Sequence, residues 1–233
     1  MDNTARAISI VIPVLNEAAG INETIANLRR SAAAGESEII VVDGDPSGGT
    51  VYAVEDDSVR RIISTQGRAA QMNRGAEAAS GDILLFLHAD TRLPGNALPL
   101  IRESMGNGRF VAGAFDLGFD TKRSIFRVTE SYVFLRTRLT RVPFGDQAIF
   151  IRSDYFRHLG GYREVPIMED VDLMKRIRRK GGRIRIIPEK VSTSPRRYER
   201  EGVLACTFRN WALQMLFALG VSPERLAKRY RPF

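Results

Sequence analysis

Residues 67–91 read GRAAQMNRGAEAASGDILLFLHADT and indicate the fold class. Residues 67–80 have helical spacing and lead into an apolar run of strand length, residues 82–90. Such nearly continuous hydrophobicity is typical of a strand covered on both faces, as in a parallel sheet. The run ends on His88 and Asp90. Positions i and i+2 of an extended chain point the same way, so both side chains can contact one ligand.

The same alternation of strand and helix precedes this unit. ISIVIPVL (residues 8–15) and EIIVVDG (38–44) are β-branched runs of strand length, and residues 17–33 have helical spacing. Alternation of this kind predicts an α/β fold, with a mostly parallel central sheet, right-handed crossovers and flanking helices.

Polar side chains follow each of the three predicted strands. Ligands of parallel α/β sheets bind beyond the carboxyl ends of the strands, so we expect these side chains to line one pocket. They are Asn16 and Glu17, together with the ring of Pro13, at the end of the first strand, Asp43 at the end of the second, and His88 and Asp90 at the end of the third.

Composition and charge limit the classes of protein. The 233 residues are 44% hydrophobic, enough for one domain or for one domain with an extension. The single cysteine, Cys206, excludes a disulfide framework. Residues 1–119 hold 10 Lys and Arg against 15 Asp and Glu, and residues 120–233 hold 25 against 12. The basic half suggests an anionic partner, although a solvated surface explains single charges equally well.

Two common phosphate-binding motifs are missing. The sequence has neither a G-x-x-x-x-G-K-[ST] loop nor a G-x-G-x-x-G turn after its first strand. The phosphates of a bound nucleotide would need another counter-charge, and a divalent cation is the obvious one. Asp90 offers an oxygen ligand that suits Mg²⁺ or Mn²⁺. His88 either adds a nitrogen ligand, which favours Mn²⁺, or only hydrogen-bonds a neighbour or a phosphate.

Several ordered motifs carry a family resemblance over roughly residues 8–182. They are SIVIPVLNE, IIVVDG, GRAAQMNRGAEAASGDILLFLHADT, FGDQAIFIRSDYFRHLGGY and MEDVDLMKRIRRKG. The chain resembles the inverting glycosyltransferases of family 2, which have the GT-A nucleotide-sugar fold, and more closely a small bacterial branch whose metal motif is His-Ala-Asp. His88 stands where the family usually opens its Asp-x-Asp motif with Asp. The resemblance implies that Asp90 is the principal metal ligand.

The resemblance also assigns residues to the donor. It implies that Pro13, Asn16 and Glu17 form the first nucleotide loop, that Asp43 reads the base, that Arg68 and Asn73 lie near the base, ribose or diphosphate, and that Asp146 and Gln147 face the donor sugar. The alternative for Arg68 and Asn73 is a helix start and a helix face, and the alternative for Asp146 and Gln147 is a turn that caps a strand.

The family's Glu-Asp motif matches Glu169 and Asp170. The resemblance implies that Asp170 is the general base of a single, inverting displacement and that Glu169 holds the acceptor pocket. Carboxylates in a first helical turn also stabilise the helix dipole, which is the alternative. In the later loop STSPRRYEREG, Arg197 is the arginine expected to close over the diphosphate, with a solvated basic turn as the alternative.

The C-terminal region is expected to add a helix. We predict a GT-A domain over residues 1–200 and a helical extension over residues 201–233. Residues 203–221 are strongly apolar but are interrupted by Arg209, Asn210 and Gln214. They predict a helix that packs on the domain, forms a dimer contact, or lies on a membrane surface. The short N-terminal apolar stretch and the lack of a spanning segment predict a cytoplasmic protein, with peripheral contact at the inner face of the membrane as the alternative.

Taken with the resemblance, these features predict a metal-dependent, hexosyltransferase-type enzyme. It would move a sugar from a UDP- or GDP-linked donor to an acceptor hydroxyl on a lipid or small molecule, with Mn²⁺ or Mg²⁺. A sugar-phosphate nucleotidyltransferase is one alternative, but it would carry a Gly-rich basic signature near the N-terminus. A basic nucleic-acid-binding protein is the non-enzyme alternative, and the chain lacks a recognised motif for it.

Overall fold

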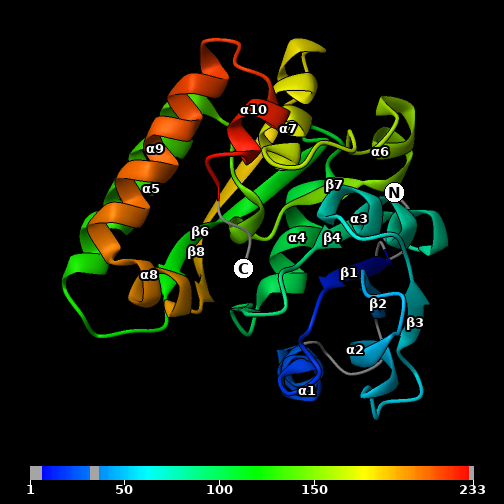
Figure 1. Ribbon diagram of the computed structural model, residues 1–233. Coiled ribbons are helices and arrows are strands. Elements are labelled where there is room, and N and C mark those ends of the chain that lie inside the picture. The colour runs from blue at the N-terminus through cyan, green and yellow to red at the C-terminus, as the bar shows by residue number, and fades with distance from the viewer. Residues whose placement is uncertain (1–6, 32–36, 231–233) are drawn as a thin grey trace.

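The computed structural model describes residues 7–31 and 37–230. Within them, eight strands form one sheet in the order β3-β2-β1-β4-β7-β6-β8-β5 (Figure 1). The strands are β1 (Ile8–Val14), β2 (Ser37–Asp43), β3 (Arg60–Ile63), β4 (Ile83–Phe86), β5 (Thr91–Arg92), β6 (Ala112–Phe119), β7 (Phe150–Arg152) and β8 (Ile184–Thr193).

Helices connect and cover these strands. They are α1 (Ile21–Ser31), α2 (Gly49–Tyr52), α3 (Arg68–Ala78), α4 (Ala97–Gly106), α5 (Ile125–Thr140), the 3₁₀ helix η1 (Gly145–Gln147), α6 (Ser153–Leu159), α7 (Glu169–Arg179), α8 (Arg196–Glu201), α9 (Val203–Ala218) and α10 (Pro223–Ala227). The helices and strands predicted from the first half of the sequence are thus confirmed, except that β4 is shorter than its apolar run.

The sheet is mixed but mostly parallel. β1 pairs in parallel with β2 and β4, and β2 with β3, so the first four strands of the chain form the predicted parallel block. β7 runs antiparallel between β4 and β6, and β5 runs antiparallel on β8. Because β7 reverses direction, it brings the chain before it, including η1, to the carboxyl end of β4.

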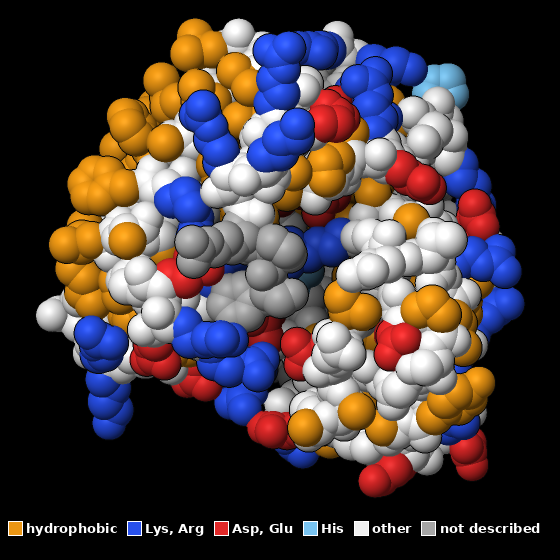
Figure 2. Space-filling view, in the orientation of Figure 1, with side chains coloured by type: hydrophobic (Ala, Val, Ile, Leu, Met, Phe, Trp, Pro, Cys, Tyr) orange, Lys and Arg blue, Asp and Glu red, His pale blue; other side chains and the backbone are white. Residues whose placement is uncertain are grey.

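The C-terminal helices pack on the domain. Oγ1 of Thr129 on α5 lies 3.4 Å from Oγ1 of Thr207 on α9, and the ring of Tyr198 on α8 packs edge-on against Phe119 and Phe126. Hydrophobic side chains remain visible along the side where α5 and α9 lie (Figure 2). Among the helices of residues 7–31 and 37–230, none has the length and apolar character of a membrane span. The domain division at residue 200 stays a prediction.

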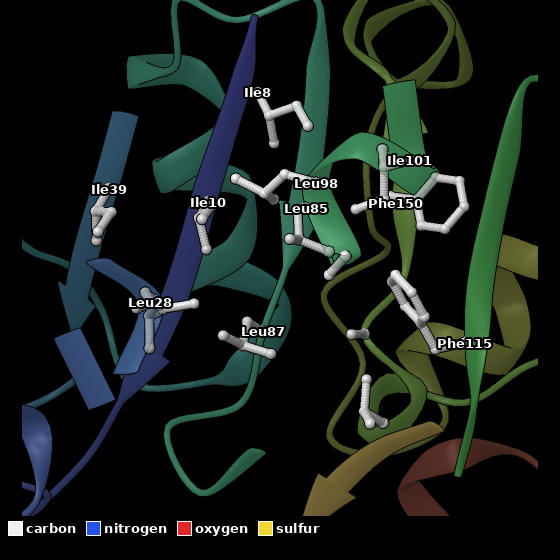
Figure 3. Packing of buried hydrophobic residues seen from close by; sticks show 14 of the residues in the cluster. Ile8, Ile10, Leu28, Ile39, Leu85, Leu87, Leu98, Ile101, Phe115 and Phe150 are labelled. Carbon is white, nitrogen blue, oxygen red and sulfur yellow. The ribbon is translucent and has the colours of Figure 1, made fainter. Parts of the chain in front are cut away.

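Two hydrophobic layers sandwich the sheet, as expected for strands buried on both faces. Alternate residues of β1 point to opposite layers: Ile10 belongs to the layer that contains residues of α1 and α4, whereas Val11 belongs to the layer that contains residues of α3 and α7. Figure 3 shows Ile10, Leu85 and Phe115 within the first layer. Side chains on both faces fix the strand ends, and thereby the loops that follow them.

Candidate active site

The carboxyl ends of β1 and β2 are tied together by one side chain. Nε2 of the buried Gln71 on α3 donates to the carbonyl oxygens of Val14 at 2.7 Å and of Val42 at 2.8 Å. A Cβ on Gly44 would lie 2.9 Å from this amide, so the loop after β2 needs glycine there. Gln71 therefore sets the spacing between the first two loops of the site.

Asp43, at the end of β2, shapes the second loop. Its carboxylate is fully buried and accepts hydrogen bonds from the backbone N–H groups of Asp45 at 3.0 Å, Thr50 at 2.8 Å and Val51 at 3.2 Å. Both oxygens are thus used to hold the loop and the start of the short helix α2. The sequence puts Asp43 against the base of a nucleotide, and that role stays a prediction.

The first loop follows β1 at the same edge. Pro13 is half-buried within β1, and the exposed Asn16 has a positive φ of 58° that helps to turn the chain. Burial raises the pKa of Glu17, against the opposing effect of Arg196 and with a further rise from Asp90. The first loop is therefore electrostatically connected with the loop after β4.

His88 lies against the backbone of Gly145. A Cβ on Gly145 would be 2.9 Å from Nε2 of His88 and 3.5 Å from Oδ2 of Asp170, so glycine is the residue that leaves room for the imidazole. Burial, and then the charge of Arg68, lowers the pKa of His88 to about 3. His88 is therefore neutral at physiological pH and keeps a nitrogen lone pair for a cation or a hydrogen-bond donor.

Asp170 and Glu169 begin α7 beside His88. The backbone N–H of Gly145 donates to Oδ2 of Asp170 at 2.6 Å. Glu169 is buried, and burial, then the charge of Asp170, raises its pKa to about 7 against the opposing charge of Arg68. One carboxylate is thus oriented by a backbone N–H, and its neighbour is partly protonated near neutral pH.

Asp146 follows Gly145 and adds a third carboxyl group. Burial raises its pKa to about 6, opposed by Arg136 and supported by Asp170 and Asp90. Its Oδ1 is buried and has no hydrogen-bond partner among the described residues. Such an atom is costly to leave unpaired and is expected to face a ligand or water. The predicted contact of Asp146 with the donor sugar stays a prediction.

Arg68 supplies positive charge to this group of carboxylates. Although desolvation opposes it, Glu169, the Tyr230 phenol, Asp170 and Asp90 raise the pKa of the Arg68 guanidinium. Arg68 stands at the first residue of α3, where a helix N-terminus also favours an anion. The arrangement fits an anionic ligand, as the sequence predicts.

Two amides that the sequence predicts beside the donor bind protein groups in the structure. The fully buried Gln147 accepts from Nη2 of Arg136 at 2.9 Å and from the backbone N–H of Phe144 at 3.1 Å, and its Nε2 donates to the carbonyl of Phe115 at 2.9 Å. These contacts use both ends of the amide within the protein, and the predicted place of Gln147 facing the donor sugar stays a prediction.

Asn73 also binds protein groups, and its predicted place near the base, ribose or diphosphate stays a prediction. Its Nδ2 donates to the carbonyl of Tyr162 at 2.9 Å, and its Oδ1 accepts from the N–H of Tyr162 at 2.9 Å. Both ends of the amide are used to join α3 to the loop before α7. Asn73 therefore positions the segment that leads to Glu169 and Asp170.

The first two arginines of α8, Arg196 and Arg197, have different partners. The guanidinium of Arg197 stacks on the ring of Tyr230 at 4.2 Å, its Nη1 donates to the Tyr230 hydroxyl, and its Nε lies 3.5 Å from Oε1 of Glu201. Nη2 of Arg196 instead lies 3.9 Å from Oε2 of Glu17 in the first loop. Arg196 is thus the arginine that reaches the first loop, and the predicted phosphate contact of Arg197 stays a prediction.

The residues around Asp90 fit a divalent cation. Asp90 is exposed, and its Oδ1 has a 3.5 Å contact with Oγ1 of Thr91. Within residues 7–31 and 37–230, no three His, Cys, Asp or Glu side chains form a complete metal cluster. An exposed carboxylate beside a neutral imidazole is the donor set expected when substrate phosphates and water complete the coordination.

Comparison with known proteins establishes the family. The profile described as "Glycosyl transferase family 2" matches residues 9–159, more than half of the chain. The chain belongs to glycosyltransferase family 2. The match includes His88, Asp90 and Asp146, whereas Asp170 and Arg197 lie beyond it.

Curated relatives carry the same family features. The chain is 28% identical to a dolichol-phosphate mannosyltransferase of Pyrococcus furiosus over 45% of its own length and 32% of the relative. It is 27% identical to an undecaprenyl-phosphate 4-deoxy-4-formamido-L-arabinose transferase of Aeromonas hydrophila, over 68% of this chain and 52% of the relative. An uncharacterized glycosyltransferase of Mycobacterium tuberculosis is 30% identical, over 68% of this chain and 63% of the relative. The chain thus spans between about a third and just under two thirds of these relatives.

A solved structure confirms the GT-A fold. A mannosyltransferase from Pyrobaculum calidifontis, in complex with GDP-mannose and Mn²⁺, matches with a TM-score of 0.69 and 18% identity. The match covers 99% of this chain and 66% of that chain. The expected α/β fold with C-terminal helices is therefore confirmed.

Three residues that shape the site could not be predicted from the sequence. The sequence pattern predicts that Gln71 and Arg136 are ordinary polar residues on helix faces and that Gly145 is a turn residue. The motif FGDQ gives a weak signal for Gly145, since a glycine beside two site candidates suggests a close approach of the backbone. The contacts of Gln71 and Arg136 depend on which strands and helices pack together.

Proposed function

We propose that the chain moves a sugar from a UDP- or GDP-linked donor to an acceptor hydroxyl, with inversion at the anomeric carbon and with Mn²⁺ or Mg²⁺ as cofactor. We place it in the small branch of the family whose metal motif is His-Ala-Asp. The proposal rests on the convergence of these groups. His88 and Asp170 both lie against Gly145, and the charges of Asp170 and Asp90 both raise the pKa of Arg68.

Asp170 is the proposed general base. The acceptor hydroxyl gives its proton to the Asp170 carboxylate while its oxygen bonds to the anomeric carbon, and the bond from that carbon to the diphosphate oxygen breaks. A single displacement inverts the configuration. The hydrogen bond from Gly145 holds the carboxylate in one orientation, which supports this role.

The carboxyl groups of Glu169 and Asp146 have different proposed roles. Glu169, with its pKa near 7, holds the acceptor side and is protonated often enough to donate a hydrogen bond. Asp146, with an unpaired buried oxygen, faces the donor sugar. The loops with Pro13, Asn16 and Glu17, and the loop shaped by Asp43, hold the nucleotide.

Asp90 would hold the cation, and His88 would act as a second ligand or would orient a phosphate. When bound, the cation would neutralise charge on the departing diphosphate. Arg68 provides a fixed positive charge on the same side, and Arg196 or Arg197 would add another from α8. The solved relative bound to Mn²⁺ and GDP-mannose supports this cofactor class.

The proposal also concerns the class of molecule that accepts the sugar. The names of two curated relatives contain dolichol phosphate and undecaprenyl phosphate, both lipid phosphates. They support a lipid acceptor over a small molecule, although the chain spans only part of each relative and the acceptor group proposed here is a hydroxyl and not a phosphate.

A thermal-shift experiment tests the donor and cofactor together. UDP and GDP are each added with Mn²⁺, with Mg²⁺ or with a chelator. We expect one nucleotide to raise the melting temperature only when a cation is present, and Asp90→Asn to remove that increase. Asp57→Asn, at a side chain that is 97% exposed, is the matched control and should behave as the unmodified protein. Equal stabilisation with chelator would contradict a metal-dependent donor site.

A pair of substitutions tests His88. If His88 binds the cation, His88→Asp should keep metal affinity but shift the preference toward Mg²⁺, because a carboxylate is the harder ligand. His88→Ala should weaken metal binding. The same metal affinity in all three proteins would exclude a direct bond to His88.

A further inference from the structure

Exposed hydrophobic residues concentrate on two adjacent helices. Among the described residues, eleven large hydrophobic side chains are exposed, and nine of them lie on α5 or on α9 with its C-cap. We name this surface the α5/α9 face; it consists of Val128, Phe134, Leu135, Leu139, Leu204, Phe208, Trp211, Met215 and Leu219.

The spacing makes the surface a continuous stripe. The five residues from α9 recur every three or four positions, which places them on one side of the helix. The opposite side of α9 is buried through Val203, Cys206 and Leu213. α9 is thus apolar on two opposite sides, and a large exposed apolar stripe usually marks an interaction surface, so we expect the exposed side to have a partner.

The face has almost no negative charge. α5 and α9 together contain one carboxylate, Glu130, whose side chain is 4% exposed. Glu130 is turned inward, where it pairs with Arg127 and Lys190 and accepts from the N–H of Phe119. An anionic partner would therefore meet no exposed carboxylate from either helix.

A group of arginines begins where α5 ends. Arg141 is the C-cap of α5, two residues after the exposed Leu139. It lines a hollow of about 490 Å³ together with Phe110 and the arginines 109, 178, 183 and 185. We name this the arginine hollow. Among the described residues, none of its five arginines has an ion-pair partner.

The arginine hollow is separate from the candidate active site. It is lined by residues just before β6 and at the start of β8, which run parallel to each other. The carboxylates of the active site lie at the opposite end of α7, which starts with Glu169 and Asp170 and ends near Arg178. The hollow therefore does not serve the donor diphosphate.

We propose that the α5/α9 face, together with the arginine hollow, docks on an anionic lipid bilayer. The apolar side chains enter the boundary between headgroups and acyl chains, and the arginines bind headgroup phosphates. Figure 2 shows the hydrophobic side chains on one side of the molecule, with Lys and Arg side chains next to their upper end.

Charge favours a bilayer over a second copy of the chain. The chain has a formal net charge of +8, so two copies that meet at this face would repel each other. An anionic surface would instead attract both the face and the arginine hollow. A symmetric dimer would also bring each hollow, with its unpaired arginines, near the other subunit without providing carboxylates.

The docking surface rests on the proposed function and adds to it the location of the acceptor. Tyr198 packs on Phe119 and Phe126 at the start of α5, and its pKa is raised by burial first and then by Asp146. The face thus begins next to the proposed sugar and acceptor side. A lipid acceptor in the docked bilayer would reach the site along this edge.

Trp211 gives a direct measurement, since it is the only tryptophan of the chain and lies within the face. We expect vesicles of phosphatidylcholine with phosphatidylglycerol to shift its emission to shorter wavelength, and brominated lipid to quench it. Pure phosphatidylcholine should bind at least about tenfold more weakly, because each arginine near an anionic surface contributes about fivefold.

Matched variants separate the two parts of the surface. Phe208→Gln should weaken binding about tenfold, since it removes one large apolar side chain. Tyr52→Gln, at a similarly exposed aromatic on α2, is its control and should bind as the unmodified protein. Arg183→Gln with Arg185→Gln should remove most of the preference for anionic vesicles. The control for lost charge is Arg60→Gln with Arg74→Gln, which should keep that preference.

Three results would overturn the proposal. One is no change of Trp211 emission with anionic vesicles, and another is equal binding by all variants. The third is an emission shift that follows protein concentration without vesicles and coincides with a dimer in ultracentrifugation. Vesicle binding uses no donor or cation, and nucleotide binding uses no vesicles, so a failure here is distinguishable from a failure of the proposed function.

Discussion

The backbone N–H of Gly145 donates a 2.6 Å hydrogen bond to Oδ2 of Asp170, across 25 residues of sequence. The same glycine leaves the space that the His88 imidazole occupies. A carboxylate from α7 and an imidazole from the loop after β4 are thereby brought together by a residue without a side chain. Substitutions at this contact and in the groups around it should have distinct effects on catalysis, metal binding and stability.

Asp170→Asn should abolish most of the transfer reaction. The amide keeps the size of the side chain and can still accept from Gly145, but it cannot take a proton. A general base contributes about 10²- to 10⁴-fold, and the rate should fall by that factor. Nucleotide binding by calorimetry should be unchanged. Glu164→Gln, at an exposed carboxylate in the loop before α7, is the control. A rate within about threefold of the unmodified enzyme would assign the base elsewhere.

Gly145→Ala should displace His88. The new Cβ would lie 2.9 Å from Nε2 of His88, closer than van der Waals contact, so the ring has to move. We expect weaker cation-dependent nucleotide binding with little loss of thermal stability, because the ring is at the rim of the core. Gly95→Ala, where a Cβ has no neighbour within 4 Å, is the matched control. Undisturbed cation dependence in Gly145→Ala would mean that the position of His88 is unimportant for the metal.

Glu169 should make stability depend on pH. Its pKa is about 7 in the folded protein, against an ordinary value of 4.5 in the unfolded chain. The folded state therefore binds the proton more tightly than the unfolded state does. This contribution to stability is complete below pH 4.5 and is lost as the pH rises through 7. Glu169→Gln removes the effect.

The free energy of unfolding in urea, measured at pH 5 and pH 8, tests this prediction. Relative to Glu169→Gln, the unmodified protein should lose on the order of 2 kcal/mol between the two values. Glu77→Gln, at an exposed carboxylate of α3, serves as the control and should follow the unmodified protein. Parallel curves for the unmodified protein and Glu169→Gln would show that the buried carboxyl titrates normally.

Gln147→Ala distinguishes a sugar contact from a structural role. The change leaves the carbonyl of Phe115 and the N–H of Phe144 without their partner in a buried place. We expect unfolding to become easier by about 3 kcal/mol, while KM for the donor stays the same after correction for folded protein. Gln66→Ala, at an exposed position, should change neither quantity. A higher KM with unchanged stability would support the predicted sugar contact over the structural role.

Much of the fold could be predicted because its signals are local. The apolar runs of β1, β2 and β4 and the helical spacing of α1 and α3 lie within single segments. The rule for carboxyl ends of parallel strands then places Asp43, His88 and Asp90 at one edge. These predictions need no knowledge of which distant residues pack together.

The contacts of Gln147 and Asn73 could not be predicted in this way. Both residues occur in motifs that resemble ligand-binding segments, but each amide is used by backbone groups that tertiary packing brings near it. The exposed apolar side of α5 could not be predicted either, since the exposure of Leu135 and Leu139 depends on what covers the helix. Sequence identifies the polar groups, whereas the fold decides which of them remain available to a substrate.

The amide of Gln71 links the carbonyls at the ends of β1 and β2, and this link has a mechanical consequence. The loops after β1 and β2, which are proposed to hold the nucleotide, keep a fixed spacing. They cannot move apart without breaking these two buried hydrogen bonds. We therefore expect opening for donor entry and product release to come from the segment from α8 to α10 and not from these two loops. Mutations that stiffen this segment should slow turnover through release of the nucleotide.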